Sequence, residues 1–314
     1  MPYWVSVSVR VTSGHAARHN ACQRSDAARF RITTLIETYI GFDSAWTDNA
    51  KAPGAICAVQ LRRGAPPLFH APRLVRFAEA LAFIQVVSSG SEYTLIALDQ
   101  PTIVPNQTSM RPVERVAASV ISWVGGGVQP ANRSRTGMFC GASPIWRFLE
   151  ELAATEDPMA ARFAKSGRHL LEVFPALALP SLEPAFFRRL GAPKYNPANT
   201  RRFRHEDWQQ VCTAACRSFE QHDLNEPASW ARAARNLRLP RKADQDRLDA
   251  VLCLAVALHW RLAPAEQSIM LGDLLSGYIV TPASAEVSTR LAKAACEKGV
   301  PVDGTPSLPD EANE

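Results

Sequence analysis

The sequence predicts an α/β fold: a mixed five-stranded sheet with helices packed on both faces. Two apolar runs, residues 39–43 and 94–98, each lead into an aspartate, which is typical of strands whose carboxyl ends reach the edge of an open sheet. Between them, residues 74–87 place apolar side chains at helical spacing, which predicts a helix that covers one sheet face. Residues 244–262 predict a nearly all-apolar helix, and a helix of that composition is buried.

The composition is typical of a globular protein. The chain has 314 residues, of which 46% are hydrophobic and 21% charged, and it contains 23 prolines. This suits one large domain with additions, or two modest ones, and disfavours a coiled coil or a disordered chain. The longest apolar run, residues 250–258, is about half of the ~18–20 residues that a membrane span needs. We therefore expect a soluble protein with no membrane partner.

The basic residues of the chain are mostly arginines. The net charge is +5 and the isoelectric point is about 8.9. Six of the 35 basic residues are lysines, which leaves 29 arginines. Arginine holds phosphate bidentately and stacks on bases, so this composition suits a nucleic-acid partner. A GC-rich coding bias explains the same composition equally well.

The cysteines indicate a reducing environment. The seven cysteines include no Cys-x-x-Cys pair, so neither a disulfide framework nor a zinc site is predicted. We therefore expect a cytoplasmic protein.

Three parts are expected along the chain. Residues 1–37 are basic and acid-poor, which predicts a disordered extension or a start codon placed too far upstream. Residues 38–282 form the main domain, with helical and loop insertions at 103–165 and 182–240. Residues 283–314 supply a C-terminal helix and a polar tail.

The first half of the main domain supplies two acids at strand ends. After the first strand we expect a hairpin to residues 55–61 and a short third strand at 68–71. If the first strand and the strand at 94–98 are parallel neighbours, Asp43 and Asp99 face each other closely enough to share a metal ion. The alternative for Asp43 is a cap or turn residue that merely ends its strand.

Two segments carry candidate contacts to a phosphate backbone. Residues 103–144 form a long loop around a helix predicted at 111–123, and loops of this length are usually functional or disordered. Residues 182–207 interleave aromatic and basic side chains, a composition typical of nucleic-acid channels. The alternatives are a solvated basic loop and an arginine-rich surface around a few anchoring rings. The candidate residues are Arg111, Arg133, Arg135, Arg201 and Arg202.

The second half of the domain adds three more acids. Glu172 lies in an apolar strand at 169–174, where a carboxylate must be paired, metal-bound or at the sheet edge. A salt bridge to one of the arginines is the structural alternative. Further helices are predicted at 144–154, 206–222 and 230–239, and a closing strand at 277–282.

Asp246 and Asp249 lie on one face at the start of the buried helix over 244–262. Capping of the helix explains one of these two acids but not both. Together with Asp43 and Asp99 they form a set of oxygen ligands, which favours Mg²⁺ or Mn²⁺ over zinc.

The order of these motifs resembles the RNase H-like superfamily, whose acids come from the first strand, the fourth strand and a final helix. Within it, the chain is similar to the predicted-nuclease family catalogued as domain of unknown function 429, and the last helix is similar to that of the RuvC resolvases. The resemblance covers about residues 38–282 and rests on Gly41-Phe42-Asp43-Ser44-Ala45-Trp46, Leu98-Asp99-Gln100-Pro101, Glu172-Val173-Phe174-Pro175, Asp246-x-x-Asp249-Ala250 and Gly277-Tyr278-Ile279-Val280.

The resemblance implies a metal-dependent nuclease. Asp43, Asp99, Asp249 and Asp246 would bind Mg²⁺ or Mn²⁺, and Glu172 would be a further ligand or orient one. Two such ions can activate water and stabilise the leaving oxygen of a phosphodiester. The alternative is a catalytically inactive protein of the same fold that binds nucleic acid or serves as an interaction module. The sugar kinases and actin-like proteins of the superfamily need Gly-rich phosphate turns in two duplicated halves, and this sequence has neither.

Overall fold

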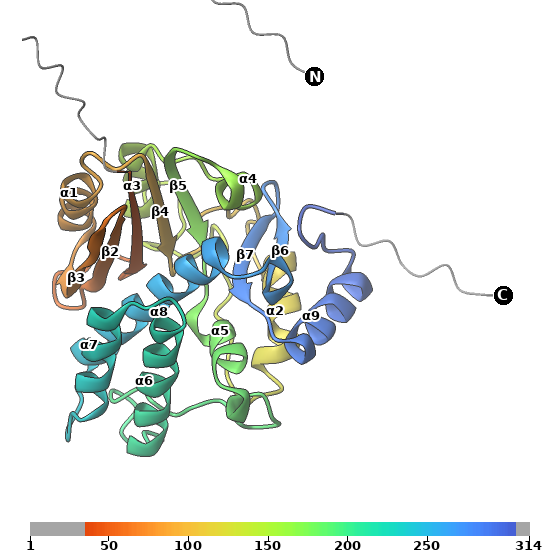
Figure 1. The fold of residues 1–314 in the computed structure, drawn as a ribbon. Helices are drawn as coiled ribbons and strands as arrows, with labels where there is room; N and C mark the ends of the chain where they lie inside the picture. Colours follow the sequence, from red (N-terminus) through yellow and green to blue (C-terminus); the bar gives the residue numbers. More distant parts are fainter. Residues whose placement is uncertain (1–34, 306–314) are drawn as a thin grey trace, which may run out of the picture. The chain divides into compact units, whose positions relative to one another are not determined.

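The computed structural model describes residues 35–305. Its centre is a mixed five-stranded sheet with strand order β3-β2-β1-β4-β5, which confirms the predicted α/β class (Figure 1). The five strands are β1 (Ile36–Asp43), β2 (Gly54–Arg62), β3 (Ala65–Val75), β4 (Tyr93–Leu98) and β5 (Gly167–Glu172).

Strand pairing brings three carboxyl ends to one edge of this sheet. The β1–β2 and β2–β3 pairs are antiparallel, so β1, β2 and β3 form a meander. Strand β1 pairs in parallel with β4, with Phe42 opposite Leu98. Strand β4 pairs in parallel with β5, with Leu98 opposite Glu172. Because the three strands run in one direction, the residues that follow them gather at the same edge.

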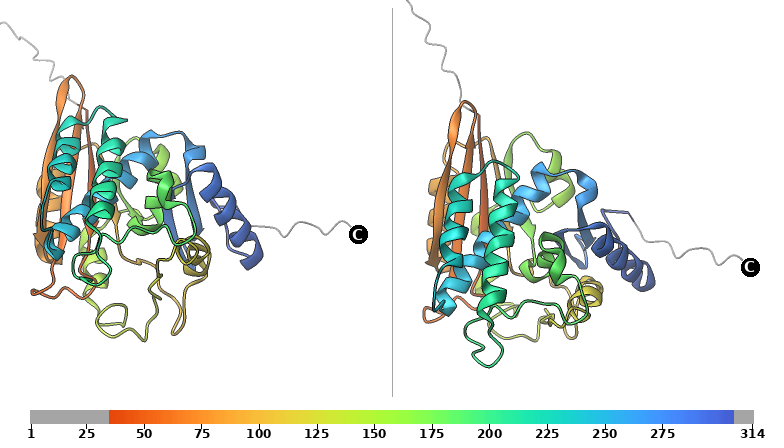
Figure 2. Two further views of the ribbon diagram at one scale, coloured as in Figure 1. Left: turned by 90° about the horizontal axis from the view of Figure 1, so that it is seen from below. Right: turned by 60° about the horizontal axis from the view of Figure 1, so that its bottom comes forward.

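Helices cover both faces of the sheet, as predicted. On one face, α1 (Phe77–Val87) and α3 (Pro144–Leu152) pack against apolar side chains of β1, β2 and β4. On the other face lies α8 (Lys242–Leu262), with α6 (His205–Glu220) and α7 (Asn225–Arg235). Figure 2 shows the sheet nearly edge-on with α6 and α7 stacked on one side of it. The predicted helix over 244–262 is therefore present and buried.

A smaller core lies beside the main one. Strands β6 (Ser268–Asp273) and β7 (Gly277–Pro282) form a separate antiparallel pair. They pack with α2 (Pro112–Ile121), α5 (Pro175–Leu182) and α9 (Ala285–Lys298). Helix α9 buries Val287 and Leu291 in this core, so the domain does not end at residue 282 as expected. Strand β1 also begins at Ile36, two residues before the expected boundary. The rest of the predicted extension, residues 1–34, lies outside the described part.

The other elements differ modestly from the prediction. Strand β5 ends at Glu172 because Phe174 and Pro175 start α5, with the proline in the first turn. Helix α7 lies about five residues earlier than the predicted 230–239. The structure adds elements that were not predicted: β6, α5, α4 (Pro158–Phe163) and the short 3-10 turns η1 (Pro184–Phe186) and η2 (Ala265–Gln267).

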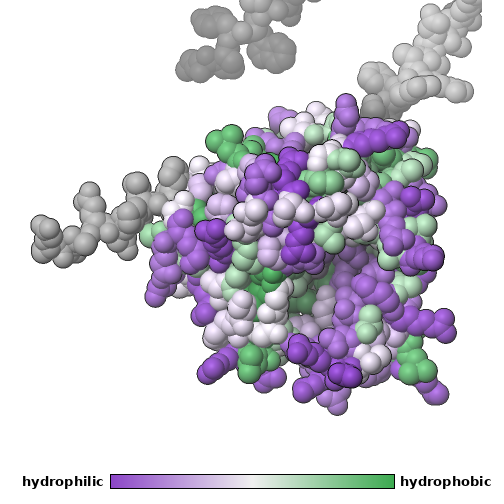
Figure 3. All heavy atoms as spheres, turned by 180° about the vertical axis from the view of Figure 1, so that it is seen from behind, coloured by the Kyte–Doolittle hydropathy of each residue, from purple (hydrophilic) through white to green (hydrophobic). Residues whose placement is uncertain are grey.

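The face seen in Figure 3 is mainly hydrophilic. Seen from behind, it is hollowed below its centre, and the floor of the hollow is apolar (Figure 3). None of the helices between residues 35 and 305 combines the length and the apolar character that crossing a membrane would require.

Candidate metal centre

Helix α8 approaches the sheet closely at one glycine of β1. A Cβ atom at Gly41 would lie 2.1 Å from the carbonyl oxygen of Ala250 and 2.3 Å from the amide nitrogen of Leu254. Both of these are backbone atoms, so a side chain at residue 41 would force the helix away from the strand. Gly41 therefore allows the start of α8 to lie over the carboxyl end of β1.

The alternation of side chains along β1 and β4 directs Asp43 and Asp99 toward α8. Tyr39 of β1 and Leu95 of β4 lie in the core on the α8 side, and residues four further along a strand share that face. The backbone amide of Asp99 donates to the carbonyl oxygen of Phe42 at 2.9 Å, which places the two acids side by side. In residues 35–305, neither carboxylate has a side-chain hydrogen bond or ion pair.

The first turns of α8 supply two further acids. Asp249 accepts hydrogen bonds from the Tyr195 hydroxyl at 2.8 Å and from Gln245 Nε2 at 3.0 Å. Asp246 forms an ion pair with Lys242, one turn earlier on the same helix. Both acids are more than 90% buried.

All four aspartates line one cavity of about 560 Å³, which we call the acid cavity. Two cations, Lys51 and Lys242, also line it. The predicted gathering of Asp43, Asp99, Asp246 and Asp249 at one sheet edge is thus what the structure contains.

The crowding of acids raises their proton affinity. Burial, and then the charges of Asp249, Asp99 and Asp246, raise the pKa of Asp43 well above its usual range. Burial, Asp249 and Glu172 do the same to the pKa of Asp99. Burial raises the pKa of Asp249 to about 6, although Tyr195 and Lys242 act against this rise. The acid cavity therefore favours the binding of positive charge to these carboxyl groups, as protons or as a cation.

The donor set fits Mg²⁺ or Mn²⁺ by its chemistry. The side chains around the acid cavity offer carboxylate oxygens and, among the described residues, no histidine or cysteine. In the same part of the chain, no three His, Cys, Asp or Glu side chains are already arranged as the ligands of one ion. Among the described residues, Asp43 and Asp99 have no side-chain partner, so they would hold a cation first. Asp249 and Asp246 would have to exchange hydrogen-bond or ion-pair partners to join them.

Glu172 lies near Asp99, but its carboxylate is paired with an arginine. Its carboxylate forms a two-point ion pair with Arg111, at 2.5 and 2.9 Å, and accepts from the Thr102 amide at 3.0 Å. Arg111 also contacts Glu114 at 2.9 Å. The alternative of a salt bridge to an arginine is therefore confirmed, and Glu172 positions the loop after Asp99 instead of offering a free oxygen.

The predicted nucleic-acid contacts divide into two groups. Arg111 is 1% exposed and held between two glutamates, so the prediction that it contacts a phosphate was wrong. Arg133 donates to the Val104 carbonyl oxygen at 2.6 Å and stacks on Trp146, so its guanidinium has structural contacts. Arg135 is half-buried, whereas Arg201 and Arg202 are exposed. Of the five predicted contacts, Arg135, Arg201 and Arg202 remain available to a ligand.

Several residues of the site were missed from the sequence. Lys242 and Gln245 lie four residues before Asp246 and Asp249, a spacing that places their side chains together on a helix. That spacing was available as a signal. Tyr195 and Lys51 come from loops distant in the sequence, and no local pattern predicts their contact with the acid cavity.

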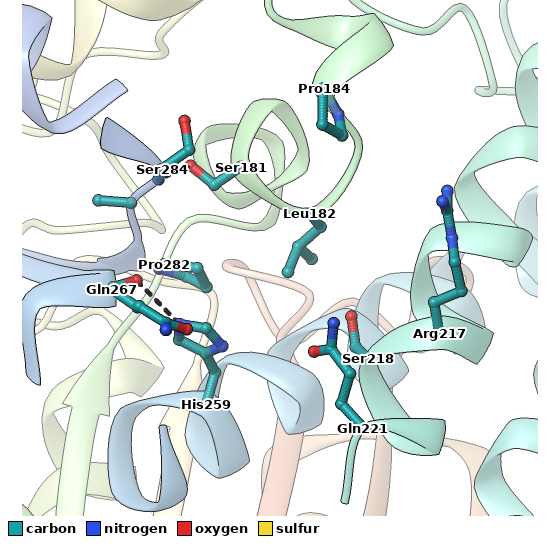
Figure 4. Close-up of a pocket in the computed structure, with 11 residues that line it drawn as sticks. Ser181, Leu182, Pro184, Arg217, Ser218, Gln221, His259, Gln267, Pro282 and Ser284 are labelled. Atoms are coloured by element: carbon teal, nitrogen blue, oxygen red, sulfur yellow. Dashed lines mark hydrogen bonds between the residues drawn. The ribbon is translucent and has the colours of Figure 1, made fainter. Parts of the chain in front are cut away.

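A different cavity, of about 380 Å³, lies between α5, α6 and the end of α8 (Figure 4). His259 lines it, with Nε2 at 2.8 Å from the carbonyl oxygen of Gln267. His259 follows Asp249 by ten residues, about 15 Å along the helix axis. Since none of the described residues around this cavity is an acid, the carboxylate chemistry belongs to the other end of α8.

The fold and the acid cavity define an α/β protein with a cluster of four aspartates at the carboxyl edge of its sheet. Residues 41–269, most of the chain, match the family described as Protein of unknown function (DUF429), so the chain belongs to that family. No curated protein and no solved structure was found to match it.

Proposed function

We propose that the protein is a nuclease that hydrolyses phosphodiesters of DNA or RNA with Mg²⁺ or Mn²⁺ held in the acid cavity. The observation that carries the proposal is the pair Asp43 and Asp99: two neighbouring carboxylates with raised pKa that have no side-chain partner among the described residues. Asp43 ends β1, Asp99 directly follows β4 and Asp249 lies in α8, which is the origin of acids that the resemblance to RNase H-like enzymes implies.

Each residue has a distinct role in this proposal. Asp43 and Asp99 would hold the cation, which when bound supplies Lewis-acid activation of water and of the scissile phosphate. Tyr195 and Gln245 keep Asp249 oriented toward the cavity. Lys242 pairs with Asp246, and the surrounding acids outweigh burial and raise its pKa, so it stays charged and can balance a phosphate.

A path for a nucleic-acid strand supports the proposal. The acid cavity shares Trp46 and Asp99 with a second cavity, and that cavity shares Gly127 and Asn196 with a third. Arg202 lines the third cavity and is exposed. A nucleic-acid strand that follows these cavities would run from an arginine to the carboxylates, an arrangement typical of single-strand grooves.

The direct test is cleavage of labelled DNA and RNA by the purified protein with Mn²⁺. Asp43→Asn keeps the shape of the side chain but removes its charge, so we expect a loss of at least about 10²-fold in rate. Glu150→Gln is the matched control because Glu150 is exposed on α3 and lies outside the acid cavity. Absence of cleavage of any substrate, or equal rates for wild type and Asp43→Asn, would contradict the proposal.

A binding protein without turnover is the second candidate. It is favoured by the ion pair between Lys242 and Asp246, which places an ammonium group among the acids, and by the lack of a preformed three-ligand group in residues 35–305. Tight binding of DNA or RNA with a steep salt dependence, without product in Mn²⁺, would support this candidate.

A further inference from the structure

A second cavity adjoins the acid cavity and shares Trp46 and Asp99 with it. We call it the side cavity. Its volume is about 420 Å³, within the range of pockets that bind small molecules. Val128, Phe174 and Ile279 give it apolar walls. A flat apolar group with polar edges would fit this lining.

Gln245 lines the side cavity, and its side chain carries a buried acceptor that has no partner among the described residues. The side chain is 8% exposed, and its Nε2 donates to Asp249 at 3.0 Å. An ionised carboxylate can only accept, so this bond fixes which end of the amide faces Asp249. The Oε1 atom at the other end is buried without a hydrogen-bond partner in the described part of the chain. Buried acceptors are rarely left in this state, and a ligand N–H group would satisfy it.

The charges around the side cavity favour a ligand with donors. Asp99, Glu114 and Glu172 are among its lining residues, and Arg111 is the cation that faces them. Both glutamates pair with Arg111, so one guanidinium faces three carboxyl groups around this cavity, and Asp99, next to the acid cavity, has no side-chain partner among residues 35–305. A ligand edge that carries an amino group is therefore better matched than one that carries only carbonyl oxygens.

Trp46 supplies a fixed aromatic surface at the boundary between the two cavities. Its Nε1 donates to the carbonyl oxygen of Asp99 at 2.9 Å, and its ring meets Phe139 edge-on with the ring centres 5.5 Å apart. Its backbone has a φ of 54°, a left-handed conformation that is uncommon for a residue with a bulky side chain. The ring is thus held in place by its surroundings beside Asp99.

We propose that the side cavity holds an amino-bearing nucleobase, extruded from its strand beside the phosphodiester in the acid cavity. Gln245 Oε1 would accept from the amino group, and Trp46 and the apolar walls would contact the faces of the base. Enzymes that act on extruded bases hold them by this combination of hydrogen bonding and stacking. The inference rests on the proposed nuclease function and adds that the substrate is unpaired at the cleaved position.

Binding of single-stranded oligonucleotides to the full-length protein tests this inference. Fluorescence anisotropy in Ca²⁺ would compare adenine and cytosine 12-mers with a thymine 12-mer and an abasic 12-mer. We expect the adenine and cytosine strands to bind at least about tenfold more tightly than the abasic strand, because each stacked base contributes to affinity. We expect the thymine strand to bind more weakly than either of them.

A substitution at Val128 tests whether the base preference arises in the side cavity. Val128 lines the side cavity but not the acid cavity, so Val128→Trp should fill the side cavity and abolish the preference for bases, whereas Val128→Ala should retain it. Circular dichroism checks the folding of both, and the wild-type comparison needs no variant. Equal affinity of wild type for the base-bearing and abasic strands would overturn the inference, as would an undiminished preference in a folded Val128→Trp.

A separate measurement distinguishes this failure from failure of the nuclease proposal. Cleavage in Mn²⁺ without a base preference would overturn the side-cavity inference alone. A base preference that Val128→Trp abolishes, without cleavage of any strand, would support the side cavity and contradict the nuclease proposal.

Discussion

Gly41 of β1 and Ala250 of α8 are in direct backbone contact, because the place of a Cβ atom on Gly41 lies 2.1 Å from the Ala250 carbonyl oxygen. The contact joins two parts of the acid cavity. Asp43 follows Gly41 by two residues, and Asp249 directly precedes Ala250. The spacing of strand and helix therefore also determines the spacing of the two carboxylates.

Gly41→Ala should damage both the fold and the acid cavity. We expect the free energy of unfolding to fall by about 1–3 kcal/mol or more, the cost of overpacking a close contact. Denaturant unfolding and Mn²⁺ titration would measure the two effects. Gly141→Ala is the matched control, since a Cβ atom there has no neighbour within 4 Å. A Gly41→Ala protein with unchanged stability and unchanged Mn²⁺ affinity would show that the contact is not needed.

Asp43→Asn should stabilise the metal-free protein at neutral pH. The folded-state pKa of Asp43 is raised by burial and by the neighbouring acids, so its stabilising contribution is present at low pH and lost as the pH rises. Asp249 behaves in the same way. Its contribution to stability is lost between about pH 4, near the ordinary aspartate pKa, and pH 6, near its raised pKa, and the loss corresponds to about 3 kcal/mol. Metal-free wild type should therefore lose stability across this range, and Asp43→Asn should lose less.

Thermal unfolding with a chelator between pH 4 and 8 measures this difference. Wild type and Asp43→Asn should converge near pH 4, where both side chains are neutral. Saturating Mn²⁺ should restore the stability of wild type alone. Parallel curves for the two proteins at every pH would contradict the account of charge repulsion in the acid cavity.

Arg111→Met should be among the most destabilising substitutions outside the acid cavity. It leaves Glu114 and Glu172 buried without a counter-charge, which costs about 3–5 kcal/mol in comparable buried pairs. Urea unfolding would measure the loss, and the double variant Arg111→Met, Glu172→Gln should recover part of it. A loss below about 1 kcal/mol would show that the ion pair contributes no more than a surface pair.

Arg201 and Arg202 should contact the nucleic-acid backbone. Replacing either by alanine should weaken binding of all sequences alike and reduce the slope of log affinity against log salt by about 1. Arg63 is the control because it is exposed in the β2–β3 turn. Its amide donates to the Leu35 carbonyl oxygen at the start of β1, so it lies at the other end of β1 from Asp43. An unchanged slope in both variants would remove these arginines from the binding surface.

The sequence predicts those parts of the site that rest on local patterns. Alternation in β1 and β4 placed Asp43 and Asp99 at strand ends, and helical spacing placed Asp246 and Asp249 on one face of α8. The partner of Glu172 was not predictable, because 29 arginines were equally eligible in the sequence. Tertiary packing alone selects Arg111.

The remaining differences between the predicted and the observed structure also arise from tertiary packing. Strand β7 was predicted, but its pairing with the unpredicted β6 in a separate sheet depends on contacts that no local pattern reveals. Tyr195 reaches Asp249 across 54 residues of sequence, so its role depends wholly on how α8 packs. Local patterns thus determine which acids reach the sheet edge, and packing determines what surrounds them.

Calorimetric titration of the metal-free protein with Mn²⁺ tests the central claim most directly. We predict that wild type and Glu150→Gln bind Mn²⁺ with release of protons near pH 6, and that Asp43→Asn and Asp99→Asn each lose this binding. A wild-type protein that takes up no Mn²⁺, or asparagine variants that bind it as tightly as wild type, would contradict the claim that these carboxylates form a metal centre.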